Sequence, residues 1–139
     1  MKKLLLILLL APTLIQAEEF NLVCEGETSV FNESKLFAKY DKTHIITIKD
    51  STLSMKVDNY IGDITYAGEH FEINKNEYIA WYTPEDTEST YPSTTININR
   101  MTGKIKFNLT QPWVNREANT KGNTYENFIG ICRKAERKF

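Results

Sequence analysis

The feature that most constrains this fold is a pair of cysteines, Cys24 and Cys132, near the two ends of a chain of 139 residues. Because the chain has 2 cysteines, a disulfide within it has only one possible pairing. Such a bond would close a loop of about 100 residues, worth on the order of 4.7 kcal/mol in the chain-entropy model. It would also make the first and last strands neighbours. Disulfides persist in oxidising compartments, so this interpretation depends on export.

The N-terminus has the parts of a secretory signal peptide. Lys2 and Lys3 form a positive start, and an unbroken run of leucine and isoleucine follows before a proline and Ala17. The apolar run is too short for a transmembrane helix, which needs about 20 apolar residues. We predict a signal peptide over residues 1–17, cleaved after Ala17, and one mature domain over residues 18–139 that resides in the periplasm or is secreted.

A lipid anchor on Cys24 is the alternative for an exported chain. The residues before this cysteine, Asn21, Leu22 and Val23, include no small residue of the kind that lipoprotein processing requires. The thiols also lack the CxxC spacing or neighbouring histidine of a metal-binding or reactive cysteine. We therefore predict a Cys24–Cys132 disulfide and a monomer with no membrane anchor after signal cleavage.

Strand-type alternation runs through most of the mature chain. Apolar or β-branched residues alternate with polar ones, and turn residues separate the runs. The clearest runs are residues 20–24, 44–49, 53–57, 61–66, 71–73, 78–82, 94–99, 104–109 and 125–133. The pattern predicts an all-β fold, a small antiparallel β-barrel or sandwich of about eight strands with its N- and C-terminal strands linked by the disulfide.

The clearest local unit is a hairpin over residues 94–109. Ile96 and Ile98 are expected to face Ile105 and Phe107 across a turn that contains Gly103. Glycine suits this turn because it adopts a positive φ without steric penalty.

Three other segments depart from the strand pattern. Residues 31–40 have a weak helical pattern, with Asn32 as a possible N-cap. Residues 83–93 and 111–123 are rich in proline, asparagine, threonine and charge, so we predict loops there, the second ending in a turn at residues 121–123.

Composition and motifs give little support to catalysis. The chain has 17 basic and 18 acidic residues, a net charge of −1, which disfavours nucleic-acid binding. The two histidines, His44 and His70, lack the further ligands of a metal site, and we expect them at the surface or at strand ends. No phosphate-binding loop or nucleophile motif is present in the sequence. We expect no metal, no cofactor and no enzymatic activity.

Loops are the expected place for recognition on a β-scaffold. The acidic cluster Glu85, Asp86 and Glu88 could steer a basic partner, with Tyr91 as an apolar anchor, although a solvated loop is the simpler interpretation. Trp113 marks the next candidate surface. The partner would be a protein or a cell-envelope ligand.

A second group of aromatic residues lies in the run YIAWY. Alternation places Tyr78 and Tyr82 on one face of this strand and Ile79 and Trp81 on the other. Core packing is the favoured role for at least one of these faces, and stacking on a sugar or peptide is the alternative.

Several short motifs together resemble small exported proteins of Gram-negative bacteria. These motifs are Phe20-x-Leu22-x-Cys24-x-Gly26, Ile98-Asn99-Arg100-Met101-Thr102-Gly103, Gly130-x-Cys132 and the terminal Lys138-Phe139. The resemblance spans nearly the whole mature chain, and it implies a periplasmic location and a small β-fold but no particular activity.

A looser similarity is to the periplasmic inhibitors of C-type lysozyme, compact β-barrels with a cysteine near each end. Their recognition segment is built on Ser-Gly-x-x-Tyr. The nearest segment here runs from Ser54 to Tyr60 and lacks the glycine, so no inhibitory residue is carried over. The sequence thus favours a non-enzymatic binding or interaction protein, with a cell-wall hydrolase inhibitor as the alternative and an enzyme without a recognisable motif as the third class.

Processing gives the first test. The intact mass of protein exported from a Gram-negative host is expected to correspond to a chain that starts near Glu18 and carries no acyl group. A diacylglycerol on Cys24 would contradict the prediction of an unanchored protein.

Overall fold

The structure, a computed structural model, describes residues 19–56, 63–85 and 92–136. These residues form nine β-strands, one 3-10 turn (η1) and no α-helix. The elements are β1 (Phe20–Asn32), β2 (Lys35–Lys49), β3 (Thr52–Lys56), β4 (Asp63–Ala67), η1 (Gly68–His70), β5 (Phe71–Ile73), β6 (Glu77–Tyr82), β7 (Ser93–Asn99), β8 (Lys104–Asn115) and β9 (Thr120–Lys134).

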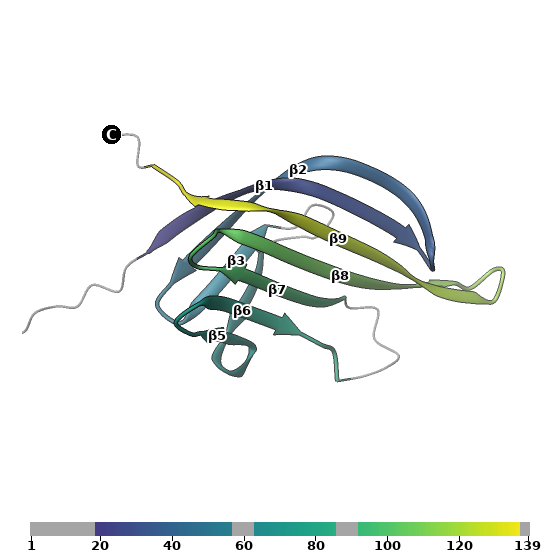
Figure 1. Cartoon of the computed structure of the whole chain (residues 1–139). Coiled ribbons are helices and arrows are strands. Elements are labelled where there is room, and N and C mark those ends of the chain that lie inside the picture. The colour runs from purple at the N-terminus through teal and green to yellow at the C-terminus, as the bar shows by residue number, and fades with distance from the viewer. Residues whose placement is uncertain (1–18, 57–62, 86–91, 137–139) are drawn as a thin grey trace, which may run out of the picture.

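All nine strands belong to one antiparallel sheet in the order β4-β3-β2-β1-β9-β8-β7-β6-β5. The sheet curls into a nearly closed barrel (Figure 1). The predicted all-β class is therefore confirmed, and of the two predicted architectures the structure has the barrel. Each strand follows its predecessor in the sheet except at β1 and β9, which join the two ends of the chain in the middle of the sheet.

The barrel has its opening between β4 and β5. Eight successive antiparallel steps around the sheet separate these two strands, so they run in the same direction. Only η1 separates them along the chain, and Gly68 within it has a φ of +58°. They are thus two halves of one interrupted strand, the first paired with β3 and the second with β6. The predicted runs 61–66 and 71–73 overlap these two halves, so the nine runs of the sequence account for the nine strands.

The predicted disulfide joins β1 to β9, where Cys24 lies directly opposite Cys132 with their Cα atoms 3.9 Å apart. Two residues further along, Gly26 lies opposite Gly130. A Cβ on Gly26 would collide with the backbone at Ile129 and Gly130, and one on Gly130 would collide with the carbonyl oxygen of Glu25. The missing side chains therefore let the two strands approach closely beside the disulfide.

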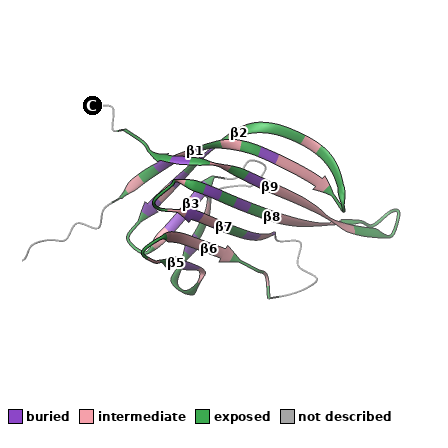
Figure 2. Ribbon diagram, in the orientation of Figure 1, coloured by how far each residue is buried: buried purple, intermediate pink, exposed green. Residues whose placement is uncertain are grey.

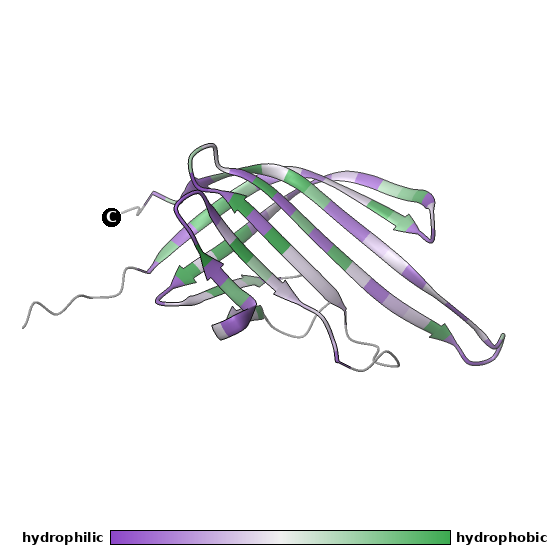
Figure 3. Ribbon diagram, turned by 60° about the horizontal axis from the view of Figure 1, so that its bottom comes forward, coloured by the Kyte–Doolittle hydropathy of each residue, from purple (hydrophilic) through white to green (hydrophobic). Residues whose placement is uncertain are grey.

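The core fills the barrel from alternate positions of its strands, and Figures 2 and 3 show buried, hydrophobic bands alternating with exposed, polar ones. The largest fully buried side chains include Tyr66, Phe107 and Phe128. The whole buried hydrophobic set is Leu22, Cys24, Ile46, Ile48, Leu53, Met55, Tyr66, Phe71, Ala80, Ile96, Ile98, Ile105, Phe107, Leu109, Phe128 and Cys132. Alternation therefore identifies the inward face, as expected for a period of two.

The predicted hairpin is confirmed as β7 and β8. Ile98 pairs with Ile105 and Ile96 pairs with Phe107, so their side chains share the buried face. Gly103 has a φ of +71°, and its amide donates to the Asn99 carbonyl at 2.8 Å. This is the turn conformation that the sequence predicts for glycine.

The helix predicted within residues 31–40 is wrong. Asn32 ends β1 and Lys35 begins β2, with Glu33 at a φ of +54° in the turn between them. The residues that suggested an N-cap belong to a hairpin turn, because asparagine and serine favour turns as strongly as helix caps. Pairing of β2 with β1 then overrides the weak helical pattern.

The loop predicted for residues 111–123 is also wrong. β8 continues to Asn115 and β9 begins at Thr120, so the turn lies at residues 116–119 and not at 121–123. This arm of the sheet is polar or exposed on much of its surface, which removes the alternation that signals a strand. Of the other predicted loop, residues 83–85 and Pro92 lie outside strands, Ser93 begins β7, and residues 86–91 lie outside the described residues.

Substitution of Gly103 by valine tests the β7–β8 turn. A Cβ there would meet the carbonyl oxygen of Cys132, in addition to the strain of a positive φ. We expect Gly103→Val to lower the melting temperature by several degrees. Gly68→Val is the matched control, because Gly68 also has a positive φ but no neighbouring atom lies within 4 Å of the place that its Cβ would occupy. Equal losses for the two variants would contradict the role of close packing at Gly103.

Candidate functional site

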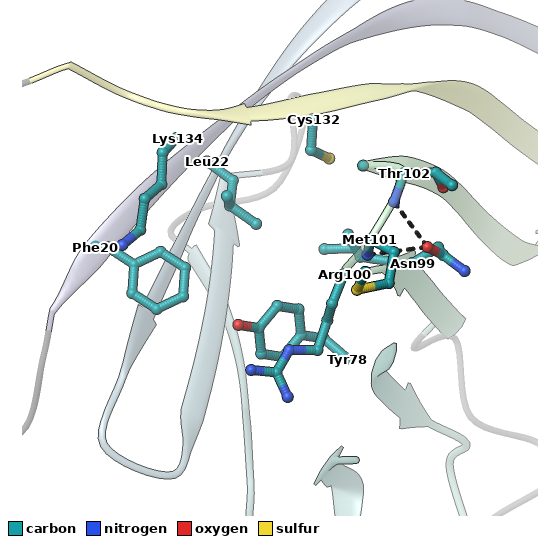
Figure 4. Close-up of a pocket in the computed structure, with 11 residues that line it drawn as sticks. Phe20, Leu22, Tyr78, Asn99, Arg100, Met101, Thr102, Cys132 and Lys134 are labelled. Carbon is teal, nitrogen blue, oxygen red and sulfur yellow. Dashed lines mark hydrogen bonds between the residues drawn. The ribbon is translucent and has the colours of Figure 1, made fainter. Parts of the chain in front are cut away.

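A hollow lies at the end of the barrel that carries the β7–β8 turn. Its volume is about 540 Å³. Figure 4 shows its lining side chains converging from β1, β6, β9 and the turn. The lining residues are Phe20, Leu22, Tyr78, Ile98, Asn99, Arg100, Met101, Thr102, Gly103, Cys132 and Lys134. We call this hollow the end pocket.

The floor of the end pocket is apolar and belongs to the core. Leu22, Ile98 and Cys132 are at least nine-tenths buried. They come from β1, β7 and β9, so the disulfide and the β1–β9 pairing fix two of the three strands that form the floor. The floor is thus a rigid part of the barrel.

The rim of the end pocket carries two aromatic rings, each covered by a cation. The rings of Phe20 and Tyr78 lie 6.3 Å apart between centroids. The guanidinium of Arg100 lies 4.9 Å from the centre of the Tyr78 ring, and the ammonium of Lys134 lies 4.8 Å from that of Phe20. Both distances are within the range of cation–π attraction, about 6 Å.

The turn that carries Arg100 is held by a network of hydrogen bonds. The side-chain oxygen of Asn99 accepts the amides of Met101 at 3.0 Å and Thr102 at 2.9 Å. Arg100 is held at both its ends, since its amide donates to the Asn76 carbonyl at 2.7 Å and its Nη1 to the Asn74 carbonyl at 2.6 Å. The guanidinium is therefore positioned before any ligand binds.

The charges at the end pocket have one sign. Arg100 and Lys134 are its only charged lining residues within the part of the chain that the structure describes. The protein as a whole has a net charge of −1. The pocket is thus a local positive site on a nearly neutral protein, which favours an anionic group.

A smaller cavity of about 240 Å³ lies beside the barrel opening, lined mainly by β4, η1, β6 and β7. Tyr66 and Thr94 line it, and the Tyr66 hydroxyl donates to the Thr94 hydroxyl at 2.7 Å. Burial raises the pKa of Tyr66, and this hydrogen bond partly opposes the increase. Each hydroxyl thus has a hydrogen-bond partner within the core, so we assign this pair a structural role.

The histidines occupy two different environments. His44 is only 2% exposed and packs edge-on against Phe107 and Phe128, with ring centroids 5.6 and 4.6 Å away. The expectation of a surface or strand-end position is therefore wrong for His44, because its ring faces the barrel interior next to Cys24. His70 lies in η1 with its side chain 42% exposed, near the Trp81 ring.

Two of the five predicted contact residues, Glu85 and Trp113, lie among the described residues. Glu85 is exposed at the end of a described segment, whereas Asp86, Glu88 and Tyr91 lie outside the described residues. Trp113 is part of β8 rather than a loop, opposite Gly122 of β9. The contact role of these residues remains a prediction.

The alternation predicted for the aromatic run is present. Tyr78, Ala80 and Tyr82 pair with Ile98, Ile96 and Thr94, whose side chains are buried. Tyr78 packs against the core, which is the favoured role, and it also lines the end pocket. Stacking on a sugar or peptide stays a prediction.

Sequence reasoning misses the end pocket because its walls come from segments far apart in the chain. The sequence presents Arg100 only as a turn residue, and Phe20 and Lys134 only as parts of terminal strands. The signal that could identify the pocket is the cross-strand neighbourhood created by the disulfide. That neighbourhood brings the start of β1 beside the end of β9.

Comparison with known proteins adds no assignment, since no family model, curated protein or solved structure matches this chain. Among the described residues, no three histidine, cysteine, aspartate or glutamate side chains are grouped as a metal site would require. The same residues contain no helix with the length and apolar character needed to cross a membrane.

Proposed function

We propose that this is an exported, non-enzymatic binding protein whose end pocket takes a small anionic molecule with a flat apolar part. The observation that carries the proposal is the arrangement at the pocket rim, where Arg100 and Lys134 each cover an aromatic ring above an apolar floor. Positive charge would attract the anionic group, and the apolar floor and the ring edges would contact the flat part.

The size and chemistry of the pocket support binding. Its volume of about 540 Å³ lies within the range of small-molecule sites, about 300–1,000 Å³. Arginine and lysine side chains are protonated at neutral pH, so they would hold and orient an anion rather than abstract a proton. The disulfide suits an oxidising compartment, in agreement with the predicted signal peptide.

Inhibition of a cell-wall hydrolase stays a prediction from the sequence. Its acidic contact surface includes residues 86–91, which lie outside the described residues. The end pocket is basic and would not attract a basic hydrolase.

Two probes of opposite charge test the end pocket. We expect naphthalene-1-sulfonate to bind, and naphthalen-1-ylmethylammonium, which has the same ring with a positive charge, to bind more weakly. Calorimetry gives the affinities, and amide chemical shifts are expected to change at Arg100 and Lys134. Equal affinity for both probes, or shifts confined to other residues, would contradict the proposal.

Substitution of Arg100 tests the residue that we expect to contribute most. Arg100→Gln is expected to weaken sulfonate binding about tenfold or more, because a charge-assisted hydrogen bond is lost. Arg133→Gln is the matched control, since Arg133 pairs with Glu25 at 3.0 Å and does not line the pocket. Melting temperatures establish that both variants are folded. The same loss of affinity in both variants would indicate a general effect of protein charge and would contradict specific binding at Arg100.

A further inference from the structure

Four strands extend the sheet at the end opposite the end pocket. β1, β2, β8 and β9 have 13, 15, 12 and 15 residues, whereas β6 and β7 have 6 and 7. Their two hairpins project in the same direction, away from the described ends of the chain (Figure 1). We define the hairpin ends as residues 30–40 and 110–125. The core requires no such extension, because none of the described buried residues lies within residues 30–40 or 110–125.

The two hairpin ends form one unit. β1 pairs with β9 as far as Asn32 opposite Thr124. At the turn, the amide of Glu33 donates to the Asn123 carbonyl at 3.0 Å, and the Glu33 carboxylate accepts the Asn123 amide at 2.8 Å. The β8–β9 hairpin continues beyond this point to its turn at residues 116–119. The turn of the β1–β2 hairpin is therefore fixed against the side of the β8–β9 hairpin, which extends further.

The hairpin ends expose large apolar side chains. Phe37 is 79% exposed, Leu36 51% and Val114 58%. Phe37 is at a β-bulge, because Val30 pairs with Ala38 and Phe31 pairs with Leu36, which leaves Phe37 without a partner on β1. A bulge redirects the extra side chain, here into solvent. Leu36 and Phe37 follow each other on β2 and Val114 lies on β8, so both hairpins present exposed apolar side chains.

The hairpin ends also differ in charge from the rest of the protein. Their cations are Lys35, Lys39, Arg116 and Lys121, and their anions are Glu33 and Glu117. The hairpin ends therefore carry a formal charge of +2, although the whole chain carries −1. Lys39 is paired with Glu27 at 2.9 Å, and the Glu33 carboxylate is occupied by the Asn123 amide.

We propose that the hairpin ends dock this protein reversibly on an anionic lipid surface. Phe37, Leu36 and Val114 enter the interfacial region of the bilayer, and the basic side chains contact the anionic headgroups. Exposed apolar groups flanked by cations match the two attractions that such a surface offers. The docking is independent of the end pocket, which then faces away from the membrane at the opposite end of the barrel.

The composition of the hairpin ends suits a lipid surface better than a protein partner. The core of a stable protein interface is depleted in lysine, whereas Lys35, Lys39 and Lys121 are all exposed in the hairpin ends. A lipid surface accepts exposed apolar and basic side chains without a complementary groove.

Vesicle binding tests this proposal with protein exported from a bacterial host, all variants sharing one measured N-terminus. We expect the protein to cosediment with vesicles that contain phosphatidylglycerol and much less with pure phosphatidylcholine vesicles, and added salt to weaken the binding. Phe37→Ser is expected to reduce the affinity about tenfold, because a nearly fully exposed ring no longer enters the bilayer. Combined replacement of Lys35, Arg116 and Lys121 by glutamine is expected to remove the salt dependence.

The matched control is Ile129→Thr, because Ile129 is 63% exposed on the wall of β9, away from the hairpin ends. Its affinity for the vesicles is expected to equal that of the unmodified protein. Three results would each overturn the proposal: no binding to phosphatidylglycerol vesicles, unchanged binding by Phe37→Ser, or an equal loss with Ile129→Thr. Self-association that Phe37→Ser abolishes in the absence of lipid would also overturn it and assign the surface to a second copy of the chain.

Discussion

The pairing of β1 with β9 is the interaction on which the rest of this structure depends. The two strands lie in the middle of the sheet, with β2, β3 and β4 attached on one side and β8, β7, β6 and β5 on the other. Without this pairing, the chain would form two separate meanders and no barrel. The disulfide connects residues 108 positions apart at this point, and Gly26 and Gly130 allow the backbones to approach closely. No short turn connects β1 to β9. The disulfide links them instead, and the two glycines allow their backbones to pack closely.

The same pairing determines where the two surfaces of interest lie. At one end of β1 and β9, Phe20 and Lys134 meet the β7–β8 turn and form the end pocket. At the other end, the strands continue past the core and support the hairpin ends. One rigid pair of strands therefore separates a basic, aromatic pocket from hairpin ends that expose apolar and basic side chains. This separation would allow a ligand and a lipid surface to be bound at the same time.

The sequence predicts those features whose signals are local or unambiguous. The two cysteines allow one pairing, and the β7–β8 hairpin combines regular alternation with a glycine at a position of positive φ. The arm at residues 111–123 escapes prediction because much of its surface meets solvent, so apolar alternation is absent. The helical pattern near Asn32 fails because the same residues also favour a turn. The bulge at Phe37 depends on register, which no local pattern specifies.

The end pocket escapes prediction for a different reason. Its side chains come from positions 20, 22, 78, 98–103, 132 and 134, and they meet only once the barrel closes. His44 shows the same limit, because its burial against Phe107 and Phe128 follows from the curvature of the sheet. Residues far apart in the sequence become neighbours through the order of the strands in the sheet. The cysteine pair is the feature of this sequence from which such a long-range contact could be predicted.

Thermal unfolding of the oxidised protein and of the same protein reduced by a phosphine tests the central role of the β1–β9 connection most directly. The closed loop of about 100 residues is worth on the order of 4.7 kcal/mol in the chain-entropy model, so reduction is expected to lower the melting temperature by about 10 °C or more. The same melting temperature before and after complete reduction would contradict the account, because the barrel would then close without its covalent link.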